Sequence, residues 1–274
     1  MTQIDTRAFH DFEHGGWERA AEHYAHAFGA LTIQTAPALL DAAGVVRGVR
    51  LLDVASGPGF IAGAAADRGA DASGLDFAEP MVRDARQRHP HATFTEGDAQ
   101  ALPFDAASFD AVVMNFGMLH LAQPDLAIAE AWRVLRPGGR YAFTVWAGPD
   151  KAVGFGMTLR AIEALGNNRV ALPEGPPFFR FSDTAETGRT LEAAGFSSVD
   201  ILQLPLTWRV SAADEVFAAM SRGGVRTAAV LRAQTPEALD AIREAVRREV
   251  ESYAKDGAFV LPMPAVLASG RKSS

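Results

Sequence analysis

Residues 51–54 (Leu-Leu-Asp-Val) form a short apolar segment that runs into a glycine-rich turn at 55–59 and an alanine-rich helix at about 60–69. Glycines let the backbone approach a ligand closely, and the amides that begin a helix point outward toward that ligand. Strand, glycine turn and helix in this order are typical of α/β proteins that bind ligands at one edge of a sheet. By itself the segment predicts a nucleotide-binding turn.

The alternation of strands and helices continues to residue 146 and predicts a parallel, doubly wound sheet, because right-handed crossovers join successive strands. The predicted strands are 49–54, 72–75, 93–96, 109–115 and 140–146, and the predicted helices are 60–69, 79–88 and 124–134. Residues 136–139 (Arg-Pro-Gly-Gly) are predicted to form a turn before the last of these strands.

The segments on both sides of this core are predicted to be mainly helical. They comprise helices within 7–44, interrupted at Gly15-Gly16, then helices at 155–165, 184–194, 211–222 and 235–254 and strands at 198–210 and 265–270. We expect one domain, divided into N-terminal helices (1–47), a core (48–148), a variable cap with a late strand (149–255) and a final strand with its tail (256–274). The polar end of this tail, 271–274, is expected to be frayed.

The composition, with 48% apolar and 22% charged residues, is that of an ordinary soluble globular protein. The net charge of −7 and the lack of a Lys/Arg stripe argue against nucleic acid as a partner. The chain has no cysteine, which excludes disulfides, thiolate nucleophiles and Cys-ligated zinc. No apolar run approaches the roughly 18 residues that span a bilayer. The segment before Trp17 lacks the apolar core of a signal peptide, so we expect a cytoplasmic protein.

Gly57, Gly59 and Ala62 satisfy the G-x-G-x-x-G/A fingerprint of dinucleotide-binding proteins, with Asp76 about 20 residues further on. The simplest interpretation is therefore a nicotinamide-binding unit. Asp53 argues against it, because a carboxylate inside the strand suits an ammonium group and repels a pyrophosphate. The same side chain could instead cap the following helix or accept hydrogen bonds from loop amides.

Two further acids end the next two strands. Asp76 closes the sequence Gly74-Leu75-Asp76, where a carboxylate can accept both hydroxyls of a ribose. Asp98 follows Gly97, where a carboxylate can accept the exocyclic amine of adenine. With Asp53, these acids lie at the carboxyl ends of three strands, the edge at which open α/β sheets bind ligands.

Together these residues resemble the class I S-adenosylmethionine-dependent methyltransferases, in particular the type 11 group that includes the ubiquinone and menaquinone biosynthesis enzymes. The resemblance covers about residues 17–147, including Phe109-Asp110 and residues 135–139 (Leu-Arg-Pro-Gly-Gly). It implies a Rossmann-like α/β fold with a doubly wound, mostly parallel, seven-stranded sheet and a helical substrate cap late in the chain. It also implies S-adenosylmethionine as cofactor, S-adenosylhomocysteine as product and a small-molecule acceptor.

The resemblance also assigns cofactor contacts by position, from the methionine part through the ribose and adenine to the sulfonium. In that order they are Gly57 with the backbone of Ala55, then Asp76 for the ribose, Phe77 and Met81 beside the adenine, Asp98 and Ala99 at its amine edge, and Asn115 near the sulfonium. Tyr24 on the N-terminal helix is either a further cofactor contact or a core residue, whereas Trp17 is expected to pack in the core.

Methyl transfer from a sulfonium needs mainly alignment and the exclusion of water, so no diagnostic catalytic residue is required. A phenol or acid acceptor would benefit from a general base, and His120, shortly after the fourth strand, is the best candidate. Its more ordinary role is to pack and hydrogen-bond within its loop.

Four histidines, His10, His14, His23 and His26, lie near the N-terminus. His10 and His14 are four residues apart, a spacing that could hold a metal on one helical face. No H-E-x-x-H pattern is present, and a glycine pair follows at once, so a solvated helical face is the simpler interpretation. We predict no metal.

The predicted cap is rich in aromatic side chains, and small-molecule pockets are mostly apolar with a few polar anchors. We therefore expect a lipophilic or aromatic acceptor. The predicted acceptor contacts are Phe116, Trp146, Phe179 and Arg180. Arg180 would anchor a carboxylate or phosphate, unless it is a solvated loop residue.

Two other functions remain open at this point. A nicotinamide-dependent oxidoreductase would share the glycine turn, but it leaves Asp98 unexplained, and the chain has no Tyr-x-x-x-Lys pair for hydride chemistry. A non-catalytic protein that binds S-adenosylmethionine would keep the fold without the chemistry. The sequence does not identify the methylated atom (O, N or C) or the oligomeric state, for which a homodimer is one option.

Overall fold

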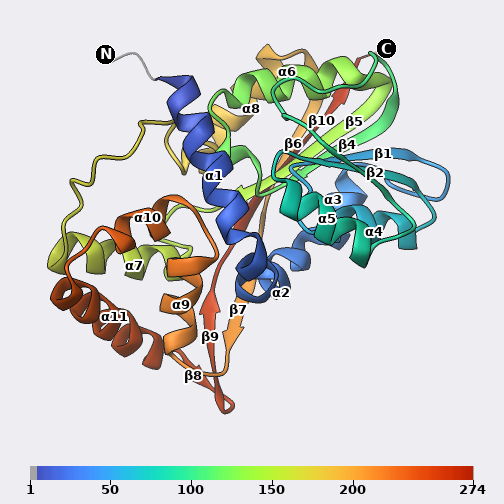
Figure 1. The fold of residues 1–274 in the computed structure, drawn as a ribbon. Helices are drawn as coiled ribbons and strands as arrows, with labels where there is room; N and C mark the ends of the chain where they lie inside the picture. Colours follow the sequence, from blue (N-terminus) through green and yellow to red (C-terminus); the bar gives the residue numbers. More distant parts are fainter. Residues whose placement is uncertain (1–4, 274) are drawn as a thin grey trace.

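A seven-stranded sheet forms the centre of the computed structural model, which describes residues 5–273 (Figure 1). Its strand order is β3-β2-β1-β4-β5-β10-β6, and every neighbouring pair is parallel except those made by β10. The strands are β1 (Arg50–Val54), β2 (Asp71–Asp76), β3 (Thr93–Glu96), β4 (Phe109–Asn115), β5 (Leu135–Trp146), β6 (Phe196–Leu204) and β10 (Ala265–Lys272). The predicted doubly wound, mostly parallel sheet is confirmed.

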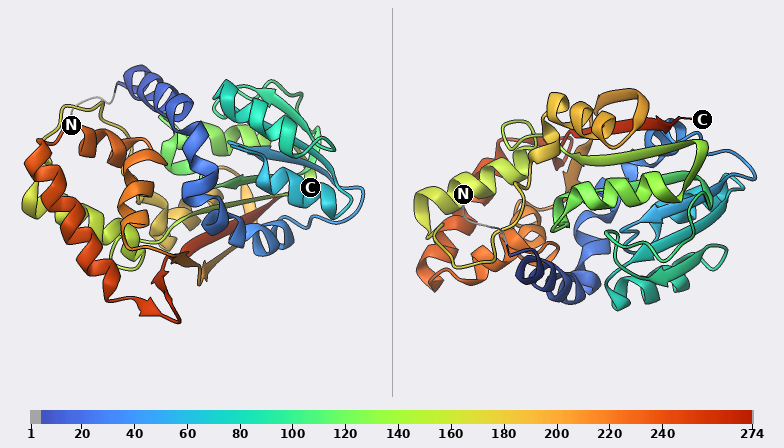
Figure 2. Two further views of the ribbon diagram at one scale, coloured as in Figure 1. Left: turned by 60° about the horizontal axis from the view of Figure 1, so that its bottom comes forward. Right: turned by 90° about the horizontal axis from the view of Figure 1, so that it is seen from above.

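Helices cover both faces of this sheet, so its central strands are buried on both sides. Neighbouring residues of one strand face opposite layers: Leu51 belongs to the core cluster that includes residues of α3, α4 and α5, whereas Leu52 belongs to the cluster that includes residues of α6 and α8. These helices are α3 (Ala36–Ala42), α4 (Phe60–Asp67), α5 (Glu79–Arg88), α6 (Pro124–Val134) and α8 (Thr184–Ala193). The view from above in Figure 2 shows the layered arrangement. The predicted bounds of α5, α6, β3 and β4 match the structure residue for residue.

The predicted interruption at Gly15-Gly16 is wrong, because α1 (Thr6–Tyr24) runs through both glycines. Gly16 has a packing reason instead. A Cβ added there would lie 2.3 Å from Cγ1 of Val225, so only glycine lets the helix approach Val225 so closely. After α1 the chain continues through a π-helical turn (Ala25–Gly29), α2 (Ala30–Thr32) and a 3₁₀ turn (Ile33–Thr35).

The predicted turn at residues 136–139 is also wrong, because these residues lie within β5. Phe109 of β4 pairs with Leu135, whereas Ala111 pairs with Arg140, so the four residues form a bulge opposite Asp110. A bulge accommodates the proline and the left-handed Gly138 (φ +80°) without ending the strand.

The predicted strand 198–210 is two strands that belong to different sheets. It divides at Pro205, and β7 (Thr207–Val210) pairs with β9 (Ala258–Pro262), which in turn pairs with β8 (Ala254–Lys255). Helices α7 (Val153–Leu165), α9 (Asp214–Arg222), α10 (Arg226–Arg232) and α11 (Pro236–Glu251) pack together beside this small sheet. Strands β8 and β9 and helix α10 were not predicted. In Figure 1, α1 lies between this group and the large sheet.

The expected fraying of the tail is wrong for Arg271 and Lys272, which belong to β10. Lys272 is buried, and its Nζ donates to the carbonyl oxygens of Trp132 and Leu135 at 2.8 Å each. Ser274 lies outside the described residues. Within residues 5–273, no helix is both long and apolar enough to cross a membrane.

Candidate active site

A hollow of about 860 Å³, partly open to solvent, lies where β1, β2, β3 and β4 end. All nine predicted cofactor-binding residues line it, so the structure brings together side chains from α1, from four strand ends and from α5. They are Tyr24, Ala55, Gly57, Asp76, Phe77, Met81, Asp98, Ala99 and Asn115. Their contacts with a bound cofactor remain predictions.

The glycine turn at residues 55–59 lines part of this hollow, and three of its residues have left-handed backbone conformations. Ala55 (φ +54°), Gly57 (φ +52°) and Gly59 (φ +80°) all have positive φ. A Cβ on Gly59 would lie 2.6 Å from Cζ of Phe94, whereas no atom lies within 4 Å of a Cβ built on Gly57. Gly59 is therefore required by packing, and Gly57 leaves open space for a ligand beside the backbone.

Asp53 is buried under the turn, with only 1% of its surface exposed. Its Oδ2 accepts a hydrogen bond from the amide of Ala62 at 3.0 Å, near the start of α4. This is the predicted helix-capping contact, but it uses only one oxygen. Among the described residues, Oδ1 of Asp53 and the buried hydroxyl of Ser56 have no partner. Burial raises the pKa of Asp53 to about 8.

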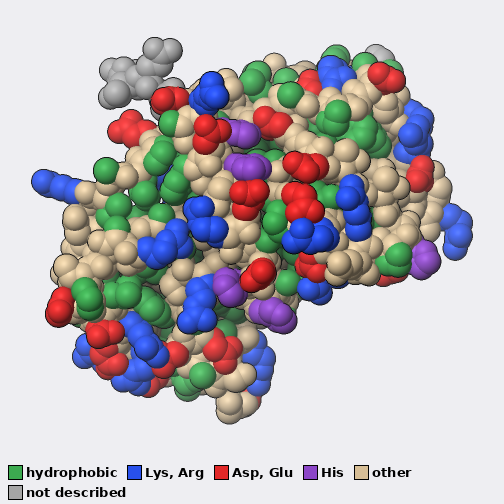
Figure 3. Space-filling model, in the orientation of Figure 1, with side chains coloured by type: hydrophobic (Ala, Val, Ile, Leu, Met, Phe, Trp, Pro, Cys, Tyr) green, Lys and Arg blue, Asp and Glu red, His purple; other side chains and the backbone are tan. Residues whose placement is uncertain are grey.

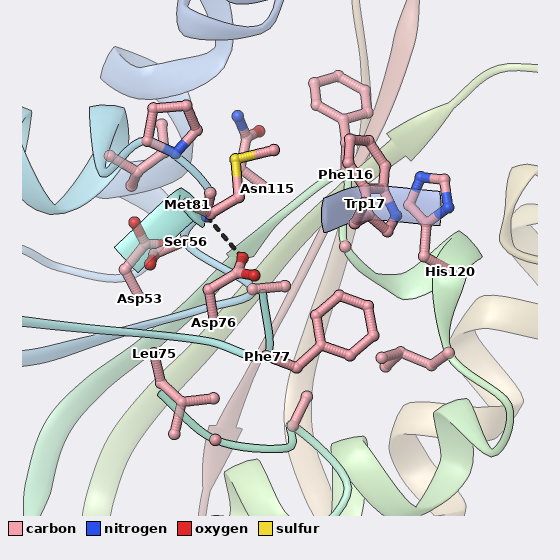
Figure 4. A pocket seen from close by; sticks show the side chains of 18 of the residues that line it. Trp17, Asp53, Ser56, Leu75, Asp76, Phe77, Met81, Asn115, Phe116 and His120 are labelled. Carbon is pink, nitrogen blue, oxygen red and sulfur yellow. Dashed lines mark hydrogen bonds between the residues drawn. The ribbon is translucent and has the colours of Figure 1, made fainter. Parts of the chain in front are cut away.

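Asp76 faces the same hollow from the end of β2. Its Oδ2 accepts from the amide of Gly57 at 2.8 Å, and its Oδ1 accepts from the amide of Ala78 at 3.0 Å. Burial raises the pKa of this carboxyl as well, and these hydrogen bonds oppose the rise. In Figure 4, Asp53 and Asp76 lie on one side of the site, and Trp17, Phe116 and His120 lie on the other. Two buried carboxyls side by side favour a ligand that brings positive charge and hydrogen-bond donors.

Asp98 forms the far end of the hollow. Its Oδ1 accepts from the amide of Gln100 at 2.8 Å, and its Oδ2 lies 3.6 Å from Nε2 of His10. The ring of Phe77 is in edge contact with His10 and His14, at centroid distances of 5.8 and 5.3 Å. The two histidines therefore cover an aromatic and acidic end of the hollow. Within residues 5–273, no group of three or more His, Asp or Glu side chains could hold a metal ion.

Asn115 is held in place by neighbours from α2, the following turn and β5. The hydroxyls of Thr35 and Thr144 donate to its Oδ1 at 2.7 and 2.5 Å, and its Nδ2 donates to the carbonyl of Thr32 at 3.2 Å. Burial raises the pKa of Tyr24, also in the hollow, to about 12, so the phenol stays neutral. These groups give the hollow a rigid, uncharged wall.

A second pocket of about 560 Å³ adjoins the first and is mainly apolar. The residues shared by the two are Trp17, Tyr24, Thr32, Phe116 and His120. The residues that line only the second include Phe28, Trp146, Phe155, Phe178, Met220 and Arg226. Trp17, expected to pack in the core, thus lines both spaces.

The predicted acceptor contacts fall into two groups. Phe116 and Trp146 line the second pocket and stack at a centroid distance of 4.0 Å. Phe179 does not line it, because its neighbour Phe178 takes that place. Arg180 does not line it either: the guanidinium pairs with Asp125 at 2.6 Å and with Glu186 at 3.0 Å. The charge of Arg180 is therefore already paired between two helices, and its role as an acceptor anchor stays a prediction.

His120 lies in the wall between the two spaces and is paired with a residue that the sequence did not indicate. Its Nδ1 lies 3.0 Å from Oε2 of Glu13, a side chain on α1 with no exposed surface. Trp17 is in edge contact with the imidazole at 4.7 Å. The only sequence signal for Glu13 was its place on the helical face that also carries His10 and Trp17.

Comparison with known proteins agrees with this geometry. A family model described as "Methyltransferase domain" matches residues 52–143. A demethylmenaquinone methyltransferase of Renibacterium salmoninarum is 39% identical over 139 residues, which are 49% of this chain and 59% of that protein. The enzyme of the same name from Clavibacter sepedonicus is 32% identical over 57% of this chain and 68% of its own length. The chain spans about half to three-fifths of the first two relatives it matches.

Among solved structures, a phosphoethanolamine N-methyltransferase of Haemonchus contortus, crystallised with S-adenosylhomocysteine, has the same fold. It gives a TM-score of 0.59 at 18% identity and covers 97% of this chain and 60% of that one. The strand order, the acids at the strand ends and the sequence relatives agree on one assignment. The chain belongs to the type 11 family of class I S-adenosylmethionine-dependent methyltransferases.

Proposed function

We propose that this protein transfers the methyl group of S-adenosylmethionine to a small, lipophilic or aromatic acceptor. The observation that carries the proposal is the pairing of two spaces with different chemistry: an acidic hollow at the strand ends and an apolar pocket next to it. His120, Phe116 and Trp17 line both, so a cofactor in one would face an acceptor in the other.

The polar groups of the hollow fit S-adenosylmethionine. Oδ1 of Asp53 and the hydroxyl of Ser56, both buried, lack partners among the described residues and suit its ammonium group. Asp76 would accept from the ribose and Asp98 from the adenine amine, with Met81 against the ring. When bound, the cofactor supplies an electrophilic methyl group on a sulfonium and leaves as S-adenosylhomocysteine.

The residues of this chain then have to align the acceptor and exclude water. Holding two reactants in a productive geometry can lower a barrier by roughly 7–11 kcal/mol. The wall made by Trp17, Phe116 and Trp146 is apolar, so it favours an acceptor with a flat apolar body. The relatives named demethylmenaquinone methyltransferase support an acceptor of lipophilic character. We also propose that residues 149–255 act as the acceptor cap.

The oxidoreductase alternative is disfavoured because the carboxyl of Asp76 already accepts from the amide of Gly57, a donor that a pyrophosphate at the glycine turn would need. A nicotinamide dinucleotide would place its pyrophosphate at the glycine turn, close to Asp53 and Asp76. On the face drawn in Figure 3, acidic and basic side chains are interspersed and no continuous basic stripe crosses it, which favours a small molecule over nucleic acid.

Isothermal titration with S-adenosylmethionine and with NAD tests the cofactor assignment. We expect micromolar binding of the first and none of the second, and the reverse would refute the proposal. Incubation with a metabolite library and S-adenosylmethionine, followed by mass spectrometry, then separates an enzyme from a protein that only binds the cofactor. An enzyme produces a compound heavier by one methylene and an equal amount of S-adenosylhomocysteine.

A further inference from the structure

Glu13 is a carboxyl group without any exposed surface, buried behind His120, a residue that lines both pockets. Its Oε2 contacts Nδ1 of His120 at 3.0 Å, and its Oε1 has no partner among the described residues. Burying a carboxylate costs several kcal/mol unless it is well paired. A Leu or Met at this position of α1 would fill the same space beside His120 without that cost, so packing alone does not explain the glutamate.

The hydrogen bond between Glu13 and His120 determines which ring nitrogen is free. A carboxylate only accepts hydrogen bonds, so beside Glu13 in that form the Nδ1 of a neutral imidazole carries the proton and Nε2 keeps its lone pair. No hydrogen bond to Nε2 is formed within residues 5–273. Trp17 and Phe178 contact the ring edgewise at 4.7 and 5.9 Å and hold its plane. The imidazole is therefore oriented, with a basic nitrogen available, in the wall shared by the two spaces.

We propose that Glu13 is a positioning residue that orients His120 as the general base for an acceptor with a hydroxyl group on an aromatic ring. This inference rests on the proposed methyl transfer and deepens it. A carbon or amine nucleophile can react without a base, whereas a neutral phenol has to lose a proton as its oxygen attacks. The stacked rings of Phe116 and Trp146 and the ring of Phe155 suit an aromatic acceptor body.

In the proposed step the phenol oxygen forms a bond to the methyl carbon while the carbon–sulfur bond of the sulfonium breaks. The electron pair of that bond remains on sulfur, which becomes neutral. The phenol proton moves to Nε2 of His120, and the carboxylate of Glu13 pairs with the resulting imidazolium. The proton then passes to water, so no oxidant or further reactant is needed.

The other charged and titratable groups around the imidazole do not replace Glu13. Asp76 at the end of β2 acts on His120 through space, but backbone amides already hold both of its oxygens. Tyr24 on α1 and Arg226 on α10 line the same pocket and form no hydrogen bond with the imidazole. Glu13 is the group that touches Nδ1.

Comparing a neutral phenol with an ionised phenol as methyl acceptors tests whether Glu13 and His120 act in proton removal. The variants are Glu13→Gln and His120→Asn, with Glu22→Gln as a matched control, because Glu22 is an exposed residue of the same helix. The probes are 4-propylphenol, which is neutral at about pH 8, and 4-nitrophenol, which is largely ionised there. Ionised 4-nitrophenol needs no base, so its rate should depend little on either group.

For 4-propylphenol we expect kcat to fall about 100-fold in His120→Asn and about 10-fold in Glu13→Gln. For 4-nitrophenol both variants should stay within about threefold of the wild type, and Glu22→Gln should behave as wild type with both probes. Equal losses with the two phenols would show a merely structural role and overturn the proposal. If S-adenosylmethionine binds but neither phenol is methylated, the acceptor class is wrong and the proposed function stands; if it does not bind, the proposed function itself fails.

A spectroscopic test needs no turnover. In protein labelled with ¹⁵N-histidine at about pH 9, where free imidazoles are neutral, the signals absent from His120→Asn identify this ring among the seven histidines. We expect the proton on Nδ1 in the wild type. A proton on Nε2 would contradict the proposed role of Glu13 even if the Glu13→Gln variant does not fold.

Discussion

The carboxyl of Asp53 leads to a prediction about cofactor binding that does not depend on the acceptor. Burial raises its pKa from the ordinary 3.8 of an aspartate to about 8. At pH 7 this group is therefore about nine-tenths protonated in the free protein. A cation placed beside the unpartnered Oδ1 favours the ionised form, so binding of S-adenosylmethionine should release close to one proton at pH 7.

Titration calorimetry in buffers of different ionisation enthalpy measures this proton directly. At pH 7 the observed enthalpy should vary with the buffer enthalpy with a slope near one proton released to the buffer, and the affinity should rise up to about tenfold between pH 6 and 7. Asp53→Asn keeps an acceptor for the amide of Ala62 but has no proton to release. Its binding enthalpy should be independent of buffer, and its binding weaker.

The raised pKa of Asp53 also predicts how the stability of the ligand-free protein changes with pH. Stability should fall as the pH rises, whereas the affinity for S-adenosylmethionine should rise. Because the folded-state pKa is raised, the contribution of Asp53 to stability is fully present below about pH 4 and is lost as the pH rises through about 8. The two pKa values correspond to an upper bound of roughly 6 kcal/mol. In urea unfolding without ligand, the free energy of unfolding of the wild type should fall between pH 5 and pH 9 relative to that of Asp53→Asn, which has no carboxyl to ionise. A buffer-independent enthalpy in the wild type, together with a constant stability difference, would refute the reasoning.

Three further predictions concern packing and binding. Gly16→Ala should lower the free energy of unfolding by about 1–3 kcal/mol in urea titrations, because its Cβ would overlap Val225, and adding Val225→Ala should restore most of the loss. Lys272→Met leaves two buried carbonyl groups without a donor and should cost about 1–3 kcal/mol in the same assay, whereas Lys255→Met on the exposed β8 should cost less than about 0.5 kcal/mol. Asp76→Asn presents an amide donor to a backbone N–H donor, so calorimetry should show at least about tenfold weaker binding of S-adenosylmethionine; unchanged affinity would contradict its place at the ribose.

The core of the fold was predictable because local patterns and burial agree there. The run 109–115 is apolar except for Asp110 and Asn115, as expected of a strand whose middle is buried on both faces, and it forms β4 with those bounds. The acids at the ends of β1 and β2 follow from the same logic, since parallel strands bring their carboxyl ends to one edge. Asp53 and Asp76 could therefore be placed near one another without coordinates.

Contacts between distant segments were not predictable by such patterns. Gly16 was interpreted as a helix break because glycine is a poor helix former, but the close approach of Val225 requires it. Arg180 looked available because its partners Asp125 and Glu186 come from two other helices. Phe178 lines the second pocket and the adjacent Phe179 does not. The two lie next to each other in a loop without a regular side-chain period, so the sequence could not show which ring faces the pocket.

The helix α1 shows where a sequence pattern could have been used further. His10, Glu13, Trp17 and Tyr24 recur at intervals of three, four and seven residues, which places them on one helical face. On an ordinary amphipathic helix the face turned toward the protein would be aliphatic. Here three of the four line the cofactor hollow, and the fourth contacts the imidazole of His120. A partly buried face made of titratable and aromatic side chains indicates a helix that closes a ligand site, so Glu13 belongs with the site and not with the core.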